Sequence, residues 1–441
     1  MDELFAVLRL LDSLLWQYIA LFMILSIGLY FTVKSKFYQV SILIRPKQYI
    51  GELLSCAEKG KQGIHPIKLY FSSVGGMVGL GNLVMIVSVV IVGGPGGILW
   101  MWLGSFLGMI VKYSEIYLGI KYRVRNTTGG YDGGPMYFLQ AAFKNSRFRL
   151  DKILPVTVSI LLCIYGAEVS QFLILMDTFS TSIFRINRYL VLGVLLVLVL
   201  ISVIGGVKRL SNICSMLMPP FMISYIALGL WIICDNYRAM PGIFLTIFQD
   251  AFSFNASTSG IIGGHILISA HYGISRAVYS GDIGIGYDSI VQSETQTTYP
   301  ERQARLAIFA LFSDTLICTM TVLIIFVTGI FEMEGIKTSE YIIHALAHYL
   351  PFSKYYIAFI FFIAAFTTVI GYLVVGLKAA HFLSQKIGHK LYLFYAIIAF
   401  IAFSFQDQSD VMLIMSVASG ILMSINLSGV FMLRKEIEFK R

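Results

Sequence analysis

Long runs of hydrophobic residues recur along the whole chain of 441 residues. An apolar run of about 18 or more residues can cross a hydrocarbon core of about 30 Å as an α-helix. The pattern therefore predicts an all-α polytopic membrane protein with about eleven transmembrane helices. We expect these spans at residues 14–33, 69–92, 98–120, 153–182, 189–206, 213–234, 257–287, 304–330, 355–385, 391–406 and 410–433.

Composition supports one membrane domain over several soluble ones. Hydrophobic residues make up 57% of the chain and charged residues 13%, whereas soluble proteins carry roughly 25% charged residues. We expect residues 1–68 to form a first transmembrane helix and a cytoplasmic amphipathic segment, 69–433 a ten-helix core, and 434–441 a short cytoplasmic tail. The cysteines are scattered and predict neither a disulfide framework nor a zinc site; they are Cys56, Cys163, Cys214, Cys234 and Cys318.

The net charge of +9 is distributed as an orientation signal. With the N-terminus placed outside, 23 of the 33 Lys and Arg residues fall on inner loops and the tail, six fall outside, and four lie within spans. This asymmetry follows the positive-inside rule, and it predicts an inner-membrane protein with its N-terminus outside and its C-terminus in the cytoplasm. The basic charge is then explained by contact with anionic membrane lipid, without nucleic acid as a partner.

Two of the predicted spans are unusually rich in glycine. One contains Gly75-Gly76-Met77-Val78-Gly79-Leu80-Gly81-Asn82; the other contains Gly260, Gly263, Gly264, Gly273, Gly281, Gly284 and Gly286. Counted from residue 69, these spans are core helices one and six of ten, and interrupted segments in corresponding halves indicate a transporter binding site. The alternative is that the glycines are small-residue contacts between helices.

A broken helix in a membrane offers chemistry that an intact helix lacks. Unwound backbone survives only where it is buried in protein or lines a wet cavity. Freed carbonyls can bind a cation, and the N-terminal ends of half-helices favour a carboxylate. A zwitterionic amino acid and a sodium ion suit such a site. The chain has no GxxxxGK[ST] motif, which disfavours an ATP-driven pump.

Several motifs, taken in order, resemble the alanine or glycine:cation symporter family, also called sodium:alanine symporters. The resemblance covers nearly the whole chain. Its motifs are Gly79-Leu80-Gly81-Asn82, Gly93-Gly94-Pro95-Gly96-Gly97-Ile98-Leu99-Trp100-Met101-Trp102, Lys112-Tyr113-Ser114-Glu115, Lys121-Tyr122-Arg123, Gly133-Gly134-Pro135-Met136-Tyr137, Gly205-Gly206-Val207-Lys208-Arg209, Pro219-Pro220-Phe221-Met222, Asp314-Thr315 and Ala365-Phe366-Thr367-Thr368.

This resemblance implies a leucine-transporter-type architecture, in which one extra helix precedes two inverted five-helix repeats. It also implies a sodium ion between core helices one and eight. The implied ligands are the carbonyls of Gly75, Val78 and Ala364 and the hydroxyls of Thr367 and Thr368. Neutral oxygens are suitable ligands for a transported hard cation. Threonine in a membrane helix also often bonds its own i−4 carbonyl, which is the structural alternative.

For the substrate, the resemblance implies main-chain groups around Gly79, Gly81 and Asn82 and the side chain of Gln171. It adds the unwound part of core helix six, here Ser280, Gly281 and Asp282. Gln171 can also be interpreted as an interhelical hydrogen-bond partner. The sequence departs from the family pattern at three places near this site, namely Leu80, Ser280-Gly281-Asp282-Ile283-Gly284 and Ala418-Ser419.

Ionisable residues within the spans are candidates for function because their burial is costly. Lys112 and Glu115 are one turn apart and are predicted to form an ion pair. Glu168 has three open interpretations: a proton acceptor, a contact for the substrate ammonium, or a residue facing a water-filled vestibule. Asp282 can serve in the site or cap the next segment, and Arg276 is predicted to pair with Asp282 or another buried acid.

His265 and His271 are predicted to be hydrogen-bonded inside the bundle, with a proton relay as the alternative.

Together these features predict a secondary active transporter that carries a small neutral amino acid, of the alanine or glycine class, with sodium into the cell. We expect it to function as a monomer. A proton-coupled or exchange carrier using Glu168 or Asp282 is a rival, and a membrane-embedded enzyme is a more distant one. An enzyme needs a clustered acid, base or nucleophile, and the His and Asp residues here are dispersed.

Overall fold

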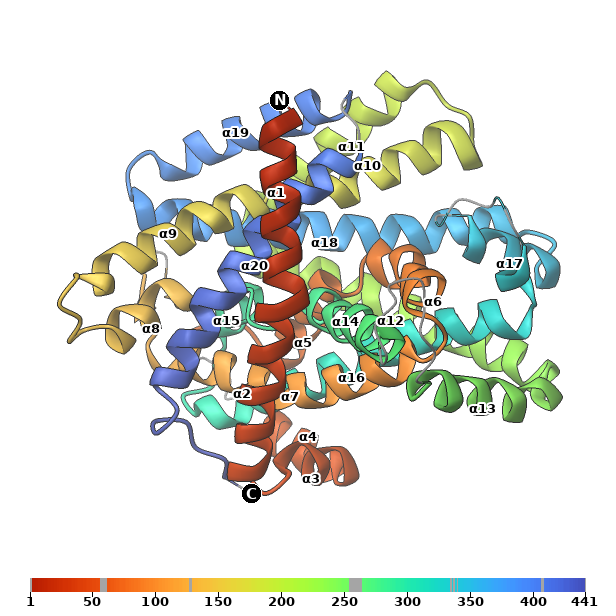
Figure 1. The fold of residues 1–441 in the computed structure, drawn as a ribbon. Coiled ribbons are helices and arrows are strands. Elements are labelled where there is room, and N and C mark those ends of the chain that lie inside the picture. Colours follow the sequence, from red (N-terminus) through yellow and green to blue (C-terminus); the bar gives the residue numbers. More distant parts are fainter. Residues whose placement is uncertain are drawn as a thin grey trace.

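The computed structural model describes residues 2–55, 62–126, 129–253, 264–333, 335, 338, 340–405 and 408–440, and these are almost entirely helical. Figure 1 shows a bundle of long, crossing helices with the two chain ends at opposite sides of the molecule. The strands described are a short antiparallel pair, β1 (Val124–Arg125) and β2 (Tyr131–Asp132). The predicted all-α class is therefore confirmed, with this small hairpin added.

The first span is one long rod. It consists of α1 (Asp2–Leu14), the π-helical turn η1 (Leu15–Ala20) and α2 (Leu21–Lys34), and it crosses in front of α20 (Gln408–Met432) in Figure 1. The indole nitrogen of Trp16 donates to the carbonyl of Ser416 at 3.1 Å. At the far end Lys34 bonds the carbonyl of Arg434, so the end of the rod meets the C-terminal tail.

Two short helices follow the rod, α3 (Tyr38–Ile44) and α4 (Pro46–Ser55), and both pack against α16 (Pro300–Val327). Arg305 of α16 holds this segment, because its guanidinium lies 2.7 Å from the carboxylate of Glu52 and 2.8 Å from the hydroxyl of Tyr38. The segment thus lies against one end of the helical core.

Core helix one is broken, as predicted. It consists of α5 (Pro66–Met77), the π-helical turn η2 (Gly81–Met85) and α6 (Val87–Gly93), with a 51° bend at the break. Val78 leaves the helical conformation at φ −83°, ψ 85°. Regular winding is thus lost at residues 78–80, within the first glycine cluster.

Core helix six is also broken, as predicted. α14 (Gly264–Ser280) ends where residues 281–286 begin a non-helical segment, and α15 (Tyr287–Val291) follows. Gly284 and Gly286 have φ values of +79° and +112°, which an L side chain rarely adopts. Gly273 lies inside α14, so it does not belong to the break. Gly260 and Gly263 lie outside the described residues.

Core helix three contains a third interruption that the sequence analysis missed. α9 (Leu150–Tyr165) stops at Gly166, and α10 (Val169–Asp177) with the π-helical turn η3 (Thr178–Ile183) continues the span. Between them Glu168 has φ +44°, in the left-handed region. A non-glycine residue there is uncommon and marks a position worth functional attention.

The remaining helices complete the bundle and its peripheral segments. Long ones are α7 (Gly97–Lys121), α12 (Gly206–Asp235) and α18 (Ser353–Leu383), and shorter apolar ones are α11 (Arg188–Val203) and α19 (Gly388–Phe403). The peripheral elements are α8 (Pro135–Ala142), η4 (Tyr237–Ala239), α13 (Met240–Ala251), η5 (Gln292–Glu294), η6 (Ile330–Glu332) and α17 (Tyr341–Tyr349).

Within the described residues, six helices are long and apolar enough to cross a membrane, or seven if the bent pair in core helix one counts as a span. The six helical stretches are Glu3–Lys34, Leu150–Thr181, Gly206–Asp235, Pro300–Val327, Ser353–Leu383 and Asp410–Met432. Several other expected spans are present as shorter helices. The predicted total of eleven spans is therefore not confirmed and stays a prediction.

Candidate functional site

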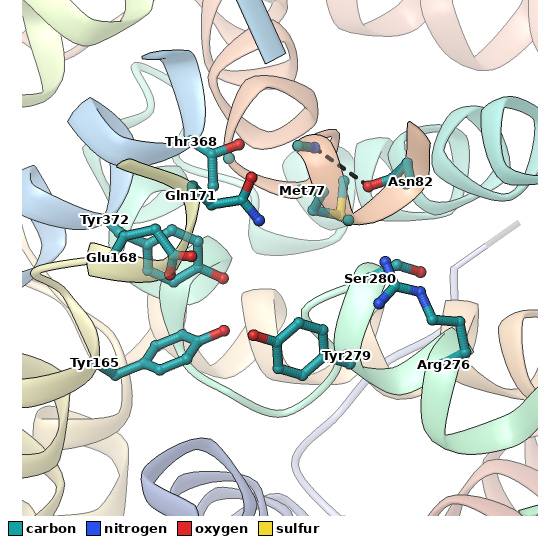
Figure 2. A pocket seen from close by; sticks show the side chains of 13 residues that line it. Met77, Asn82, Tyr165, Glu168, Gln171, Arg276, Tyr279, Ser280, Thr368 and Tyr372 are labelled. Atoms are coloured by element: carbon teal, nitrogen blue, oxygen red, sulfur yellow. Dashed lines mark hydrogen bonds between the residues drawn. The ribbon is translucent and has the colours of Figure 1, made fainter. Parts of the chain in front are cut away.

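A small pocket lies where the three interrupted helices meet. Core helices one, three and six supply most of its walls, and α18 supplies the rest (Figure 2). The lining residues are Gly76, Met77, Gly79, Gly81, Asn82, Tyr165, Glu168, Gln171, Arg276, Tyr279, Ser280, Thr368 and Tyr372. The pocket therefore includes five of the predicted substrate residues, namely Gly79, Gly81, Asn82, Gln171 and Ser280.

Side chains satisfy the backbone freed by the break in core helix one. The amide of Leu80 donates to the Gln171 carboxamide oxygen at 2.9 Å, and the amide of Gly79 donates to the Asn82 side-chain oxygen at 3.2 Å. A buried amide without a partner would be costly. Gln171 and Asn82 therefore stabilise the unwound conformation while also lining the pocket.

Asp314 joins the two broken helices, and the site prediction did not include it. Its carboxylate accepts from the Asn82 amide nitrogen at 2.5 Å and from the Ser280 hydroxyl at 3.1 Å. Asp314 is fully buried on α16. The sequence held one signal, since Asp314-Thr315 is among the family motifs, but nothing in its spacing indicated a link to residues 82 and 280.

Three of the predicted sodium ligands converge between α5 and α18. The Thr368 hydroxyl lies 3.2 Å from the Gly75 carbonyl and 2.9 Å from the carbonyl of Ala364, the i−4 residue of its own helix, so the structural alternative is also present. The Thr367 hydroxyl lies 3.3 Å from the Ala364 carbonyl, but its shorter bond, at 2.8 Å, is to Ile363 of its own helix. The two helices touch closely here, because a Cβ added at Gly75 would lie 3.3 Å from the Thr367 Cβ.

This set of neutral oxygens fits a monovalent cation. Carbonyl and hydroxyl oxygens on two helices lie within hydrogen-bond distance of one another, and Thr368 also lines the pocket. Oxygen ligands without several carboxylates bind a hard cation loosely enough for release. The Val78 amide bonds the carbonyl of Val74 at 2.7 Å; the role of its own carbonyl stays a prediction.

The predicted ion pair between Lys112 and Glu115 is wrong. The Lys112 ammonium lies 2.7 Å from the Asp288 carboxylate and 3.9 Å from that of Asp282. Glu115 instead accepts from the Gly284 amide at 3.1 Å and from the Ser289 hydroxyl at 3.0 Å. The break in core helix six supplies carboxylates to Lys112 and a free amide and a hydroxyl to Glu115, so each group is bonded across helices and not along its own.

Lys112 also bonds the carbonyl groups of the break itself, at Gly281 and Asp282. Asp282 accepts from the Tyr372 hydroxyl at 2.6 Å. Neither Gly281 nor Asp282 lines the pocket. Of the three residues predicted on core helix six, the structure therefore brings only Ser280 to the pocket, and Asp282 lies in a buried ion cluster beside it.

The predicted pairing of Arg276 with Asp282 or another buried acid is also wrong within the described residues. The guanidinium lies over the Tyr279 ring, 5.7 Å from its centroid, and its Nε and Nη2 atoms have no hydrogen-bond partner there. Glu168 accepts from the Ser170 hydroxyl at 2.8 Å through Oε1, while its Oε2 is buried without a partner. Both residues line the pocket, on facing walls in Figure 2.

The two histidines considered earlier lie outside the pocket. His265 is 3.0 Å from the carboxylate of Asp250, which also accepts from the Gly96 amide at 2.8 Å. His271 is 3.2 Å from the hydroxyl of Ser275. The prediction that both are hydrogen-bonded inside the protein is confirmed, and neither contacts the candidate site.

A second buried ion cluster lies about three turns along α18. The Lys378 ammonium is 2.6 Å from the carboxylate of Asp132 and also pairs with Glu294. Ten residues separate it from Thr368, which corresponds to roughly 15 Å along a helix. The cluster joins α18 to β2 and to the segment after α15, so it fixes the two halves of the core at the end away from the pocket.

The comparisons with known proteins agree with this arrangement. Residues 1–439 match the family described as sodium:alanine symporters. An uncharacterized transporter of Haemophilus influenzae is 29% identical over 437 residues, which cover 98% of this chain and 94% of the relative. AgcS, a sodium/alanine symporter of Methanococcus maripaludis, is 28% identical over 395 residues, which cover 86% of this chain and 84% of the relative.

A solved structure shares the fold. The crystal structure of MhsT in complex with L-phenylalanine superimposes with a TM-score of 0.59 and covers 85% of this chain and 89% of that one. Sequence identity is 16%. The expected leucine-transporter-type architecture is therefore confirmed.

Proposed function

Because this chain belongs to the sodium:alanine symporter family, we propose that it carries a small neutral amino acid, of the alanine or glycine class, into the cell together with sodium. Membership makes the chain a multi-pass membrane carrier that couples an amino acid to a cation, and not an enzyme. The proposal adds the substrate class, the identity of the ion and the residues that hold each.

The observation that carries the proposal is the shared break in core helix one. Before the break, the Gly75 carbonyl of α5 lies against Thr368, and after it Gly81 and Asn82 of η2 line the pocket. In the proposed mechanism sodium binds Gly75, Val78, Ala364, Thr367 and Thr368. The amino acid binds Gly79, Gly81, Asn82, Gln171 and Ser280, and Gly281 and Asp282 shape the backbone behind it.

Coupling then follows from the common backbone. A cation that orders residues 75–78 also fixes the groups at residues 79–82, so each ligand lowers the conformational cost of binding the other. Both ligands bind from outside, the bundle rocks around the site, and both leave to the inside. One sodium ion supplies about 2.3 kcal/mol per 100 mV and about 1.4 kcal/mol per tenfold gradient.

We further propose an orientation with the N-terminus outside and the C-terminus in the cytoplasm, in the inner membrane. The distribution of Lys and Arg supports it. The contact between Lys34 and Arg434 also supports it, since the first rod then separates the two chain ends. The protein would contact anionic lipid through its basic inner face and work as a monomer.

Uptake into proteoliposomes tests the proposal. Small amino acids are screened with an inward sodium gradient, and with choline replacing sodium at clamped pH. We expect saturable uptake that needs sodium. Thr368→Ala should abolish the sodium dependence, because it removes the hydroxyl next to the Gly75 carbonyl. Thr157→Ala is the matched control, since that hydroxyl bonds the Ile153 carbonyl of its own helix.

A proton-coupled or exchange carrier is the second candidate. It is favoured by the buried Oε2 of Glu168, which has no hydrogen-bond partner among the described residues. The same assay separates the two. Uptake that persists in choline and follows a pH gradient would replace sodium coupling with proton coupling. Uptake that needs only a second amino acid on the opposite side would establish exchange.

A further inference from the structure

The pocket holds two charged side chains that the family resemblance does not assign to substrate binding. Glu168 is 2% exposed and Arg276 is 9% exposed. Neither forms an ion pair among the described residues, and Oε2 of Glu168 and the Nε and Nη2 of Arg276 lack hydrogen-bond partners there. Burial of a charge without a partner is among the costliest arrangements in a protein. An arrangement of this kind is understandable where a ligand supplies the missing partners.

The two charges lie at different ends of the pocket. A Cβ added at Gly81 would lie 2.6 Å from the Arg276 Nη2, so the guanidinium touches the first residue of η2. Arg276 therefore forms the positive pole of the pocket.

Glu168 lies on the other wall, one helical turn before Gln171 (Figure 2). The left-handed backbone at Glu168 interrupts core helix three and presents the carboxylate to the pocket. Ser170 satisfies Oε1 and leaves Oε2 for another donor. The Gln171 carboxamide oxygen already accepts from the Leu80 amide, so Glu168 alone forms the negative pole.

We propose that Glu168 and Arg276 are a two-pole receptor for the substrate, in which Glu168 accepts the ammonium and Arg276 donates to the carboxylate. This inference rests on the proposed function and narrows its substrate class. The pair is neutral as a whole, so a zwitterion leaves no net charge in the pocket. A compound that lacks either the ammonium or the carboxylate leaves one buried charge unpaired, and an amino acid with a charged side chain adds a charge without a partner.

The receptor is tested with ligands that lack either the ammonium or the carboxylate, and with protein variants that lack the charge proposed to bind it. Thermal stabilisation of the purified protein in saturating sodium reports affinity for L-alanine, for L-alaninamide, which lacks the carboxylate, and for L-lactate, which lacks the ammonium. We expect the wild type to bind alanine at least about tenfold more tightly than either analogue, since each analogue loses one bond to a charge and such a bond is worth roughly tenfold or more.

The variants should then show a crossed pattern. Glu168→Gln should reduce the ratio of the affinities for alanine and lactate about tenfold or more, and should leave the ratio of the affinities for alanine and alaninamide unchanged. Arg276→Gln should reduce the ratio for alaninamide and leave the ratio for lactate unchanged. A merely structural role would weaken all three ligands together. Glu301→Gln and Arg209→Gln, at charged residues away from the pocket, are matched controls that should leave both ratios unchanged.

Equal losses for all three ligands, or unchanged ratios in well-folded variants, would overturn the receptor. Glycine, serine and glutamine are titrated in parallel, each with its analogues that lack the carboxylate or the ammonium. If none of the amino acids stabilised the protein, the receptor would also be overturned. Binding without transport would instead contradict the proposed carrier while the receptor stands, because the thermal measurement needs no transport.

Discussion

Two groups of buried charges lie on either side of the break in core helix six, and they differ in ion pairing. Behind the break, Lys112 is paired with Asp288 and Asp282 and bonded to the carbonyl of Gly281. In front of it, Arg276 and Glu168 line the pocket and form no ion pair among the described residues. Side chains of both groups are buried, so the groups differ in charge compensation and not in burial. We interpret the first group as support for the unwound backbone, and the proposed receptor assigns the second group to the ligand.

The largest effect is expected for Lys112→Met, which removes the cation that pairs with Asp288 and Asp282. Asp288 and Asp282 would then be buried without compensation, at a cost of about 3–5 kcal/mol. We expect most of the protein to be lost from the monodisperse peak in size-exclusion chromatography. The double variant K112M/D288N should recover part of it. Normal folding and uptake by K112M alone would mean that the group does not support the break.

The next effect concerns the close packing of the two broken helices. A Cβ at Gly76 would lie 2.2 Å from the Tyr287 ring, so Gly76→Ala should lower stability by about 1–3 kcal/mol through overpacking. Gly193→Ala is the matched control, because nothing lies within 4 Å of a Cβ there. The melting temperatures of both variants, measured by thermal unfolding, test this expectation. Equal melting temperatures would show that the contact between α5 and α15 is looser than described.

A third prediction addresses the carboxylate that bridges the breaks. Asp314→Ala removes the acceptor for Asn82 and Ser280. A bond to a charged group contributes about 1.5–3 kcal/mol. We expect the equivalent of one such bond to be lost from substrate binding, so uptake at low substrate concentration should fall roughly 10- to 100-fold. Asp314→Asn, which keeps one acceptor oxygen, should lose less. If D314N and D314A were equally impaired in initial-rate measurements, charge rather than bridging would be the function of Asp314.

The smallest effect is expected outside both groups. His271→Gln removes a ring that bonds Ser275 and lies away from the pocket. His271 is only partly buried and Gln can still bond Ser275, so sodium-dependent uptake should remain within about twofold of the wild type. A large loss of uptake in the same assay would instead support a proton relay through His271.

The breaks in core helices one and six could be predicted because glycine clusters mark backbone that must unwind. The break in core helix three could not. It contains a single glycine, Gly166, and its left-handed residue is Glu168, a type with no particular preference for that conformation. Packing against neighbouring helices imposes the left-handed conformation on Glu168, and the residues next to Glu168 in the sequence do not reveal that packing.

The partners of the buried charges could also not be predicted from the spacing of residues along one helix. Lys112 and Glu115 are one turn apart, yet Lys112 binds Asp288, which is 176 positions away in the chain. Asp314 meets Asn82 and Ser280 only after three helices have packed together. The family resemblance supplied Gln171 and Thr368, which line the pocket, because motif order preserves positions that pairwise spacing does not show.

We propose that the unwound backbone of core helix one holds a cation and an amino acid together. Titration of the purified protein with alanine at several sodium concentrations, and with sodium at several alanine concentrations, measures this coupling. We expect each ligand to raise the affinity for the other by the same factor, at least about tenfold, and Thr368→Ala to remove this effect. Independent binding of the two ligands to the wild type would contradict it.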